Sequence, residues 1–399
     1  MSSAPVADDQ PTPIDSREQW RRGRGFLNDH RFALTGRLLA ENTPENLIPG
    51  TPLLARRHWI PEEPVPLEQV RLNWRPDAPA APLDGGDPEL DHIRPHREDG
   101  TVYLNYADAV RDLAKPRLFE NRKCYRLLDV EASTAGPTLT FGRGQYFDVI
   151  NICEAAAHEY AAAALAASDR PVDPSATPFR AAIADPTDLA RRPVMAATST
   201  LTIRNDRTTG EAEFVLHWRD PEKVASGGGL YQVMPVGMFQ ASHDAPWNEE
   251  NDFDLWRAVL RELSEELLGE TEDYGSGRAP IDYAAWPLNK TLTAAREEGR
   301  LRIFWLGLGV DPLTFVTDML TVAVFDADLF DETFQRIVST NDEGHLVGLE
   351  DATGRSTGIP FTAEQVDRLT GSEPMQPAGA ALLRLAWRHR KALLGGSFQ

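Results

Sequence analysis

The sequence predicts an α/β protein whose C-terminal half is a sandwich of sheet and helices. Two apolar runs, residues 301–310 and 317–325, have the length and composition of buried strands. They follow an amphipathic acidic helix around residues 256–267, and they precede two amphipathic segments, 362–369 and 378–394, which we expect to be helices. Strands and helices that alternate in this way pack as layers, with helices on the faces of a sheet.

A hairpin is predicted before the acidic helix. Residues 201–204 and 213–219 are apolar or alternate between apolar and polar side chains, as strands do. The stretch between them, 205–210, is polar and ends in a glycine, which favours a turn. We therefore expect the two strands to pair.

The N-terminal half is predicted to be a mixture of helices and short strands. No motif in this half indicates a chemistry. The helices are expected over residues 15–39, 107–113 and 146–167, and the strands over residues 70–74, 123–130 and 138–141.

Composition suggests how the chain is divided. Residues 1–13 are small, polar and proline-rich, so we expect a disordered tail. Residues 169–193 contain five prolines, and we expect a linker there. The predicted domains are therefore 14–168, a mixed α/β domain without an assigned role, and 194–395.

The charge and the cysteines limit the class of function. A formal net charge of −20 argues against a nucleic-acid-binding surface, although a bound cation reverses the local sign and allows a nucleotide substrate. Cys124 and Cys153 have no metal-ligand spacing, and as free thiols they favour a reducing cytoplasm. No run of eighteen apolar residues exists, so we expect no membrane span and no membrane partner.

Three glutamates of the acidic helix form the strongest candidate site. Glu262, Glu265 and Glu266 are spaced i, i+3 and i+4, so they lie on one side of the helix. Carboxylates held this close repel one another, and a hard divalent cation between them relieves the repulsion. The pattern therefore predicts a site for Mg²⁺ or Mn²⁺. The alternative is a solvated helix face, but the only cationic side chain nearby is Arg261.

The segment Arg261–Glu266, with the sequence Arg-Glu-Leu-Ser-Glu-Glu, resembles the Nudix hydrolase signature. Upstream, Met234-Pro235-Val236-Gly237 is similar to the turn that precedes the Nudix helix. The hairpin, the turn and the acidic helix follow one another in the order of the family. The resemblance covers roughly residues 195–390, about half of the chain.

The resemblance implies a fold, an activity and a set of site residues. The family has a Nudix α/β/α sandwich and hydrolyses nucleoside diphosphates linked to another group, using Mg²⁺ or Mn²⁺. Its glutamates bind the metal and one of them helps to activate water, its loop glycine can offer a carbonyl, and a later loop often adds an acidic ligand. The implied catalytic residues are Glu265, Glu266 and Arg261, and the implied metal ligands are Glu262, Glu265, Glu266, Gly237 and Glu343, with Asp342, Glu350 and Asp351 as further candidates for the later loop.

The loop before the helix departs from the family. It carries an insertion within residues 240–251, and Phe253, flanked by Asp252 and Asp254, stands where the family has a glutamate. The closing glycine comes one residue late, at Gly269. In the insertion, Trp247 could stack on a base or could anchor the loop.

Two classes of function fit these observations. The first is a metal-dependent Nudix hydrolase acting on a nucleotide-like small molecule. The second is a ligand-binding or regulatory protein with a Nudix fold and little turnover, since the layout is also similar to the Nudix-like domains of actinobacterial regulators. Residues 1–60 show no helix-turn-helix module that would bind DNA. In either class, the N-terminal half is expected to cover the site or to build a homodimer.

Overall fold

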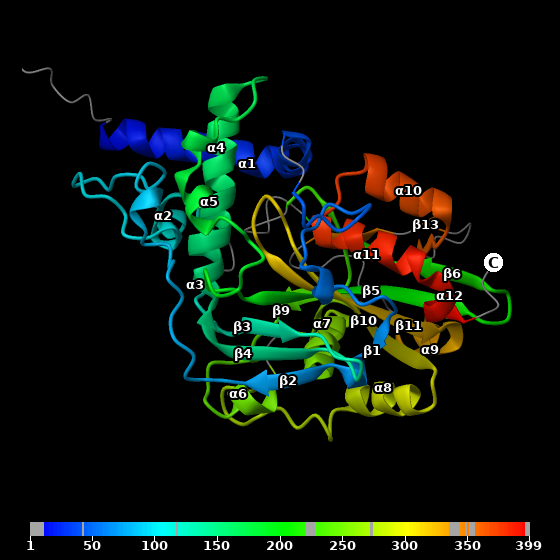
Figure 1. Cartoon of the computed structure of the whole chain (residues 1–399). Helices are drawn as coiled ribbons and strands as arrows, with labels where there is room; N and C mark the ends of the chain where they lie inside the picture. Colours follow the sequence, from blue (N-terminus) through cyan, green and yellow to red (C-terminus); the bar gives the residue numbers. More distant parts are fainter. Residues whose placement is uncertain are drawn as a thin grey trace, which may run out of the picture.

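A seven-stranded mixed sheet forms the centre of the protein (Figure 1). The computed structural model describes residues 12–41, 44–116, 119–219, 228–271, 274–334, 344–347, 349–350 and 356–395. The strand order is β1–β10–β11–β5–β6–β15, with β9 paired to β5. These strands are β1 (Val65–Pro66), β5 (Ala196–Asp206), β6 (Glu211–Phe214), β9 (Val236–Met238), β10 (Leu301–Val310), β11 (Thr317–Asp326) and β15 (Ile359–Pro360).

The predicted α/β class is confirmed, and the predicted strands 201–204, 301–310 and 317–325 lie in this sheet. β5 and β6 pair antiparallel, with Ile203 opposite Phe214, so the hairpin forms. The second predicted strand, 213–219, is divided, because residues 211–214 form β6 whereas residues 216–219 form β7 of a smaller sheet. β10 and β11 are antiparallel neighbours, and β11 runs parallel to β5. Nine consecutive residues of β11, 317–325, are buried, because both faces of the sheet are covered.

Helices cover the two faces of the sheet. Figure 1 shows α11 above the sheet and α7 with α8 below it, and α11 packs on β5, β10 and β11 while α7 packs on β5 and β9. None of the helices in the described part of the chain is both long and apolar enough to cross a membrane. The helices of this half are α6 (Asn248–Asn251), α7 (Leu255–Leu268), α8 (Pro287–Glu297), α9 (Ala327–Thr333), α10 (Ala363–Ser372), α11 (Pro377–Arg388) and α12 (Arg390–Leu394).

The N-terminal half contains the predicted helices and strands. A second sheet, with the order β2–β4–β3, is made of β2 (Arg71–Trp74), β3 (Lys123–Glu131) and β4 (Thr138–Gln145). The long alanine-rich helix expected over 146–167 runs through a π-helical turn at residues 150–154. The helices are α1 (Pro13–Glu41), α2 (Tyr106–Leu113), α3 (Tyr146–Val149), α4 (Ala155–Ala167) and α5 (Pro178–Ile183).

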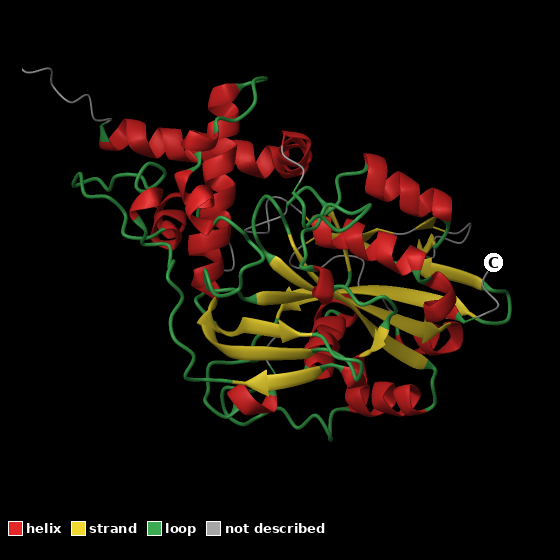
Figure 2. Ribbon diagram, viewed as in Figure 1, coloured by secondary structure: helices red, strands yellow, loops and turns green. Residues whose placement is uncertain are grey.

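Helices α1 and α4 cross each other and carry a buried charge cluster at the crossing (Figure 2). Arg31 pairs with Glu154 at 2.8 Å, and Arg24 pairs with the same carboxylate. All three side chains are buried, so the ion pairs compensate charges that have lost their water. Gly23 lies against the His158 ring, where an added Cβ would overlap it, so the glycine allows the helices to come close.

The two halves of the chain are joined because a strand of the N-terminal half belongs to the central sheet. β1 comes from the N-terminal half and forms an edge of the central sheet by pairing with β10. The stretch 169–193, expected as a linker, contains α5, and its Phe179 and Ile183 are fully buried. This stretch is therefore packed against its neighbours, whereas the division of the chain at that point stays a prediction. The expected disordered tail lies outside the described residues up to position 11.

Two smaller sheets complete the structure. One has the order β12–β7–β8, and the other pairs β13 with β14. Their strands are β7 (Leu216–Arg219), β8 (Tyr231–Val233), β12 (Gly344–Val347), β13 (Leu349–Glu350) and β14 (Ser356–Thr357).

Candidate functional site

The acidic helix α7 is defined at both ends by its own sequence. Asp254 is the N-cap, and its side chain accepts a hydrogen bond from the Arg257 backbone N–H at 2.8 Å. Gly269 ends the helix in the left-handed conformation, with φ of 69°, which a glycine adopts without strain. Between these ends, Leu260, Leu263 and Leu267 are fully buried and orient the helix on the sheet.

The acidic side of α7 faces a large cavity. The cavity has a volume of about 1500 Å³ and is lined by Glu262, Glu265 and Glu266 together with Arg261 and Gly237. Ligand pockets are usually smaller, roughly 300–1,000 Å³. The structure therefore brings five of the six predicted site residues to the wall of one cavity.

The sixth, Glu343, and its neighbour Asp342 lie outside the described residues. The same holds for Asp351, and of Glu350 only the backbone, in β13, is described. A ligand from this later loop therefore stays a prediction.

Gly237 packs directly on the first glutamate of the motif. A Cβ at this position would overlap the carboxylate of Glu262, so an alanine would force that carboxylate to move. Gly237 belongs to β9, which pairs with β5, and its carbonyl accepts a hydrogen bond from the Thr198 hydroxyl at 3.2 Å. The contact places Gly237 beside the acidic side of the helix.

The other two glutamates have different surroundings. Glu266 is buried and accepts a hydrogen bond from the Val236 backbone N–H at 3.0 Å. Glu265 is half-buried and accepts one from the Tyr274 hydroxyl at 2.7 Å. Burial raises the pKa of the Tyr274 phenol, and the negative charge of Glu265 raises it further, so the phenol keeps its proton and acts as a donor.

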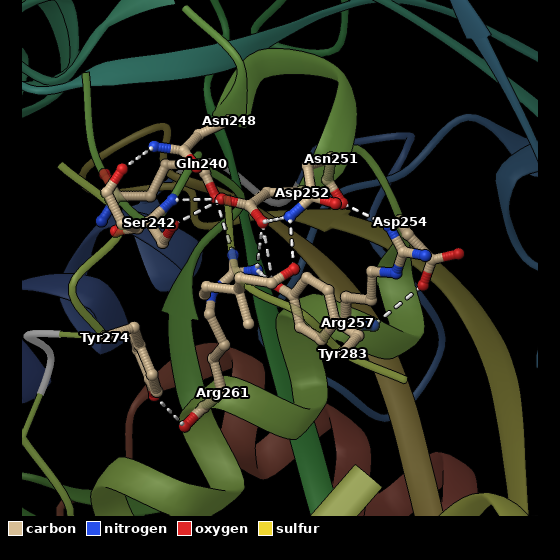
Figure 3. Close-up of polar contacts among 12 residues, drawn as sticks. Gln240, Ser242, Asn248, Asn251, Asp252, Asp254, Arg257, Arg261, Tyr274 and Tyr283 are labelled. Atoms are coloured by element: carbon tan, nitrogen blue, oxygen red, sulfur yellow. Dashed lines mark hydrogen bonds and ion pairs between the residues drawn. The ribbon is translucent and has the colours of Figure 1, made fainter. Parts of the chain in front are cut away.

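Arg261 is buried among the residues that hold the preceding loop. Its guanidinium donates to the Tyr283 hydroxyl at 2.5 Å and to the Gln240 carbonyl at 2.8 Å, and it lies 3.7 Å from the Asp252 carboxylate (Figure 3). Burial by itself would lower the pKa of Arg261, but Tyr283 and Asp252 outweigh it and raise the pKa, so the side chain stays charged. We infer from these contacts that Arg261 is a positioning residue that ties helix to loop.

The Asp252 carboxylate, next to Phe253, accepts hydrogen bonds from several groups of the loop before α7. It is fully buried, and one of its oxygens accepts hydrogen bonds from the Ser242 N–H at 2.8 Å and the Ser242 hydroxyl at 2.6 Å. The other oxygen accepts from the Tyr283 hydroxyl at 2.8 Å (Figure 3). The loop before α7 is therefore held by a network of its own side chains and backbone with Tyr283.

Trp247 anchors the inserted loop. Its indole N–H donates to the Ser276 carbonyl at 2.9 Å, and the residue is not part of the cavity wall. Of the two roles open to Trp247 from the sequence, the contact supports the anchor.

The described residues contain no preformed cluster of metal ligands. Across the part of the chain that the structure describes, no three or more His, Cys, Asp or Glu side chains are grouped so that they could hold a metal ion.

The N-terminal half contributes cavity residues that no motif in the sequence indicated. Arg31 and Phe32 of α1, Glu154 of the π-helical turn and Tyr146 of α3 line the same cavity as the glutamates. Tyr274, shortly after the motif, and Asp318, on β11, line it as well. No local pattern points to these residues, because their proximity arises only when the chain folds.

Comparison with known proteins adds no relative. No protein-family model matches the chain, and none of the curated proteins matches it.

Proposed function

We propose that the protein is a metal-dependent hydrolase of the Nudix type. It cleaves a diphosphate bond in a small molecule that carries a nucleoside diphosphate. The observation that supports the proposal is the common cavity wall formed by Glu262, Glu265, Glu266 and Gly237. A cavity this large has room for a substrate with a group on each side of the diphosphate.

The residues present fit Mg²⁺ or Mn²⁺. Glutamates line the wall together with Gly237, and carboxylate and backbone carbonyl oxygens are the ligands that these hard cations prefer. Mg²⁺ commonly keeps several waters and binds through one or two carboxylates together with substrate phosphates, so a closed cage of protein ligands is not required. Glu262, Glu265 and Glu266 would hold the ion, which would supply charge neutralisation of the phosphates and a water of lowered pKa.

The side chains of this site have separate roles in the proposed reaction. Glu265 or Glu266 accepts the proton of the attacking water. Tyr274 donates to Glu265 and thereby fixes the direction of that carboxylate. Arg261 holds the loop through Gln240 and Tyr283.

A second candidate function is ligand binding without useful turnover. The absence of a preformed metal cluster among the described residues favours this alternative. In that case the cavity binds a nucleotide without cleaving it. The part of the cavity wall that belongs to the N-terminal half changes on binding and transmits the signal that the nucleotide is bound. Both candidates take a small-molecule partner and neither requires nucleic acid or a membrane.

The proposal includes a location and a role for the N-terminal half. Cys124 and Cys153 are buried free thiols, which suits the reducing cytoplasm. Burial raises the pKa of both thiols to about 12, so neither is reactive. The N-terminal half covers the site, since its residues line the cavity, and a homodimer stays part of the proposal.

Titration of Mn²⁺ into the wild type and into Glu265→Gln/Glu266→Gln tests the metal site. We expect binding in the wild type and its loss in the double variant. Glu270→Gln is the matched control, because it removes a carboxylate from the same cavity wall outside the motif. A screen for release of a nucleoside monophosphate from nucleoside diphosphate-linked compounds then separates the two candidates: release supports the hydrolase, and tight binding without release supports the second function. Unchanged Mn²⁺ binding in the double variant would show that Glu265 and Glu266 do not hold the metal.

A further inference from the structure

A buried carboxyl group on the sheet lies in the same cavity, outside the glutamate motif. Asp318 is the second residue of β11 and is only 6% exposed, yet it belongs to the cavity wall. It lies opposite Ala197 of β5, and Ala197 lies opposite Met238 of β9. Side chains opposite one another on neighbouring strands share a face of the sheet, and all three residues line the cavity.

This row relates Asp318 in space to the glutamate site. Neighbouring strands are about 4.8 Å apart, so two strand spacings, on the order of 10 Å, separate β11 from β9. Gly237, which packs on Glu262, is the residue of β9 next to Met238. The pentose and the base of a nucleotide together can span such a separation when its diphosphate lies at the glutamates.

Asp318 has hydrogen-bonding capacity that the protein does not use. The Ser199 hydroxyl donates to its Oδ1 at 2.8 Å. The described residues provide neither a hydrogen bond to Oδ2 nor an ion pair to this carboxyl. Oδ2 is not one of the fully buried atoms without a partner, and Asp318 lines the cavity, so this oxygen is reached from the cavity and is open to a ligand. The contrast with Asp311 is direct, because there one oxygen accepts from the Leu313 N–H and the other from the Thr314 hydroxyl, each at 2.8 Å.

The electrostatic surroundings of Asp318 raise the pKa of its carboxyl group. Burial raises the pKa of Asp318 to about 7, the hydrogen bond from Ser199 lowers it, and the neighbouring negative charge of Asp311 raises it again. Both the neutral and the ionised form are therefore present near neutral pH. In either form, an oxygen of Asp318 can accept a hydrogen bond from a ligand.

We infer that Asp318 is a specificity-determining residue that accepts a hydrogen bond from an amino group on the base of the ligand. The inference rests on the proposed function, in which the diphosphate lies at the glutamates and the base lies over the sheet. A ligand N–H satisfies the open oxygen, and a ligand without that N–H leaves a buried acceptor unpaired. Sites of this kind discriminate strongly against the analogue that lacks the donor.

The test uses matched pairs of non-hydrolysable ligands, so that binding is measured apart from turnover. The α,β-methylene analogue of ADP is compared with that of purine riboside diphosphate, and the analogue of GDP with that of IDP. Each pair differs by one amino group. We expect the wild type to bind the amino member of at least one pair about tenfold more tightly. Equal affinity in both pairs overturns the inference without the use of any variant.

Three variants assign the preference to a side chain. Asp318→Val removes the acceptor and retains a side chain that favours strands, so the preference is expected to disappear. Asp318→Asn keeps an acceptor oxygen, so the preference is expected to remain. Asp311→Asn removes a neighbouring buried charge whose oxygens are already bonded, and it is expected to leave the preference unchanged. A preference that survives in Asp318→Val, or that Asp311→Asn removes equally, overturns the inference.

The outcomes separate this inference from the proposed function. An amino preference that depends on Asp318, with no release of nucleoside monophosphate from hydrolysable nucleoside diphosphate-linked compounds, supports the inference and overturns the hydrolase. Release of nucleoside monophosphate that depends on Glu265 and Glu266, without an amino preference, supports the hydrolase and overturns the inference.

Discussion

The buried carboxylate of Asp252 is expected to determine the stability of the loop before the acidic helix. Asp252→Ala removes the acceptor of hydrogen bonds from Ser242 at 2.6 and 2.8 Å and from Tyr283 at 2.8 Å, and it leaves the buried guanidinium of Arg261 without its carboxylate neighbour. A net loss of about 1.5–3 kcal/mol is typical for one hydrogen bond to a charged group, and such losses are not additive within a network. Breaking a buried pair costs about 3–5 kcal/mol, which we take as the expected loss.

Urea unfolding of Asp252→Ala and Asp254→Ala measures this difference. The two aspartates flank Phe253, but Asp254 is only half-buried and caps the helix through one hydrogen bond, to the Arg257 N–H at 2.8 Å. Loss of an N-cap costs about 1 kcal/mol. If the two variants lose the same free energy of unfolding, Asp252 does not hold the loop and the reasoning is refuted.

Three further predictions concern the cavity. Gly237→Ala would push a methyl group into the Glu262 carboxylate and force it to move, so we expect weaker Mn²⁺ binding by calorimetry with little change in the free energy of unfolding, whereas Gly25→Ala, in open space on a helix, should change neither. Tyr274→Phe removes the donor to Glu265, and Mn²⁺ affinity should fall about 10–100-fold at an unchanged melting temperature; unaltered affinity would contradict the positioning role. The folded-state pKa of about 7 at Asp318 lies above the usual value of a free carboxyl, so its contribution to stability is present below pH 4 and is lost as the pH rises through 7. The melting temperature of Asp318→Asn relative to the wild type should therefore rise between pH 4 and pH 8, and a constant difference would contradict the raised pKa.

The elements of the fold that follow local patterns were predictable. The acidic helix follows from its leucine spacing, and its ends follow from a capping aspartate and a glycine, Asp254 and Gly269. β10 and β11 are apolar along most of their length, which is the pattern of strands covered on both faces. The packing of the proline-rich stretch 169–193 was not predictable from local patterns. Prolines predict a break in regular structure, but they do not reveal that Phe179 is fully buried.

The different roles of Asp252 and Asp254 could not be predicted. The two aspartates flank Phe253 and are equivalent in the sequence. Their roles differ because the chain enters α7 between them: Asp254 turns to the helix N-terminus, whereas Asp252 turns inward to Arg261 and Tyr283. The partner Tyr283 lies 31 residues away, so no local pattern reveals the contact.

The sequence by itself determined that this is an α/β protein and that three glutamates lie on one side of a helix, since periodicity depends on residues only a few positions apart. Only the tertiary structure decided what those glutamates face. The cavity takes its walls from α1, from the inserted loop, from β9 and from β11. Asp318 belongs to β11, and β5 lies between this strand and β9. Such a site arises from contacts between distant segments, and these depend on how the layers pack and not on any single stretch of the chain.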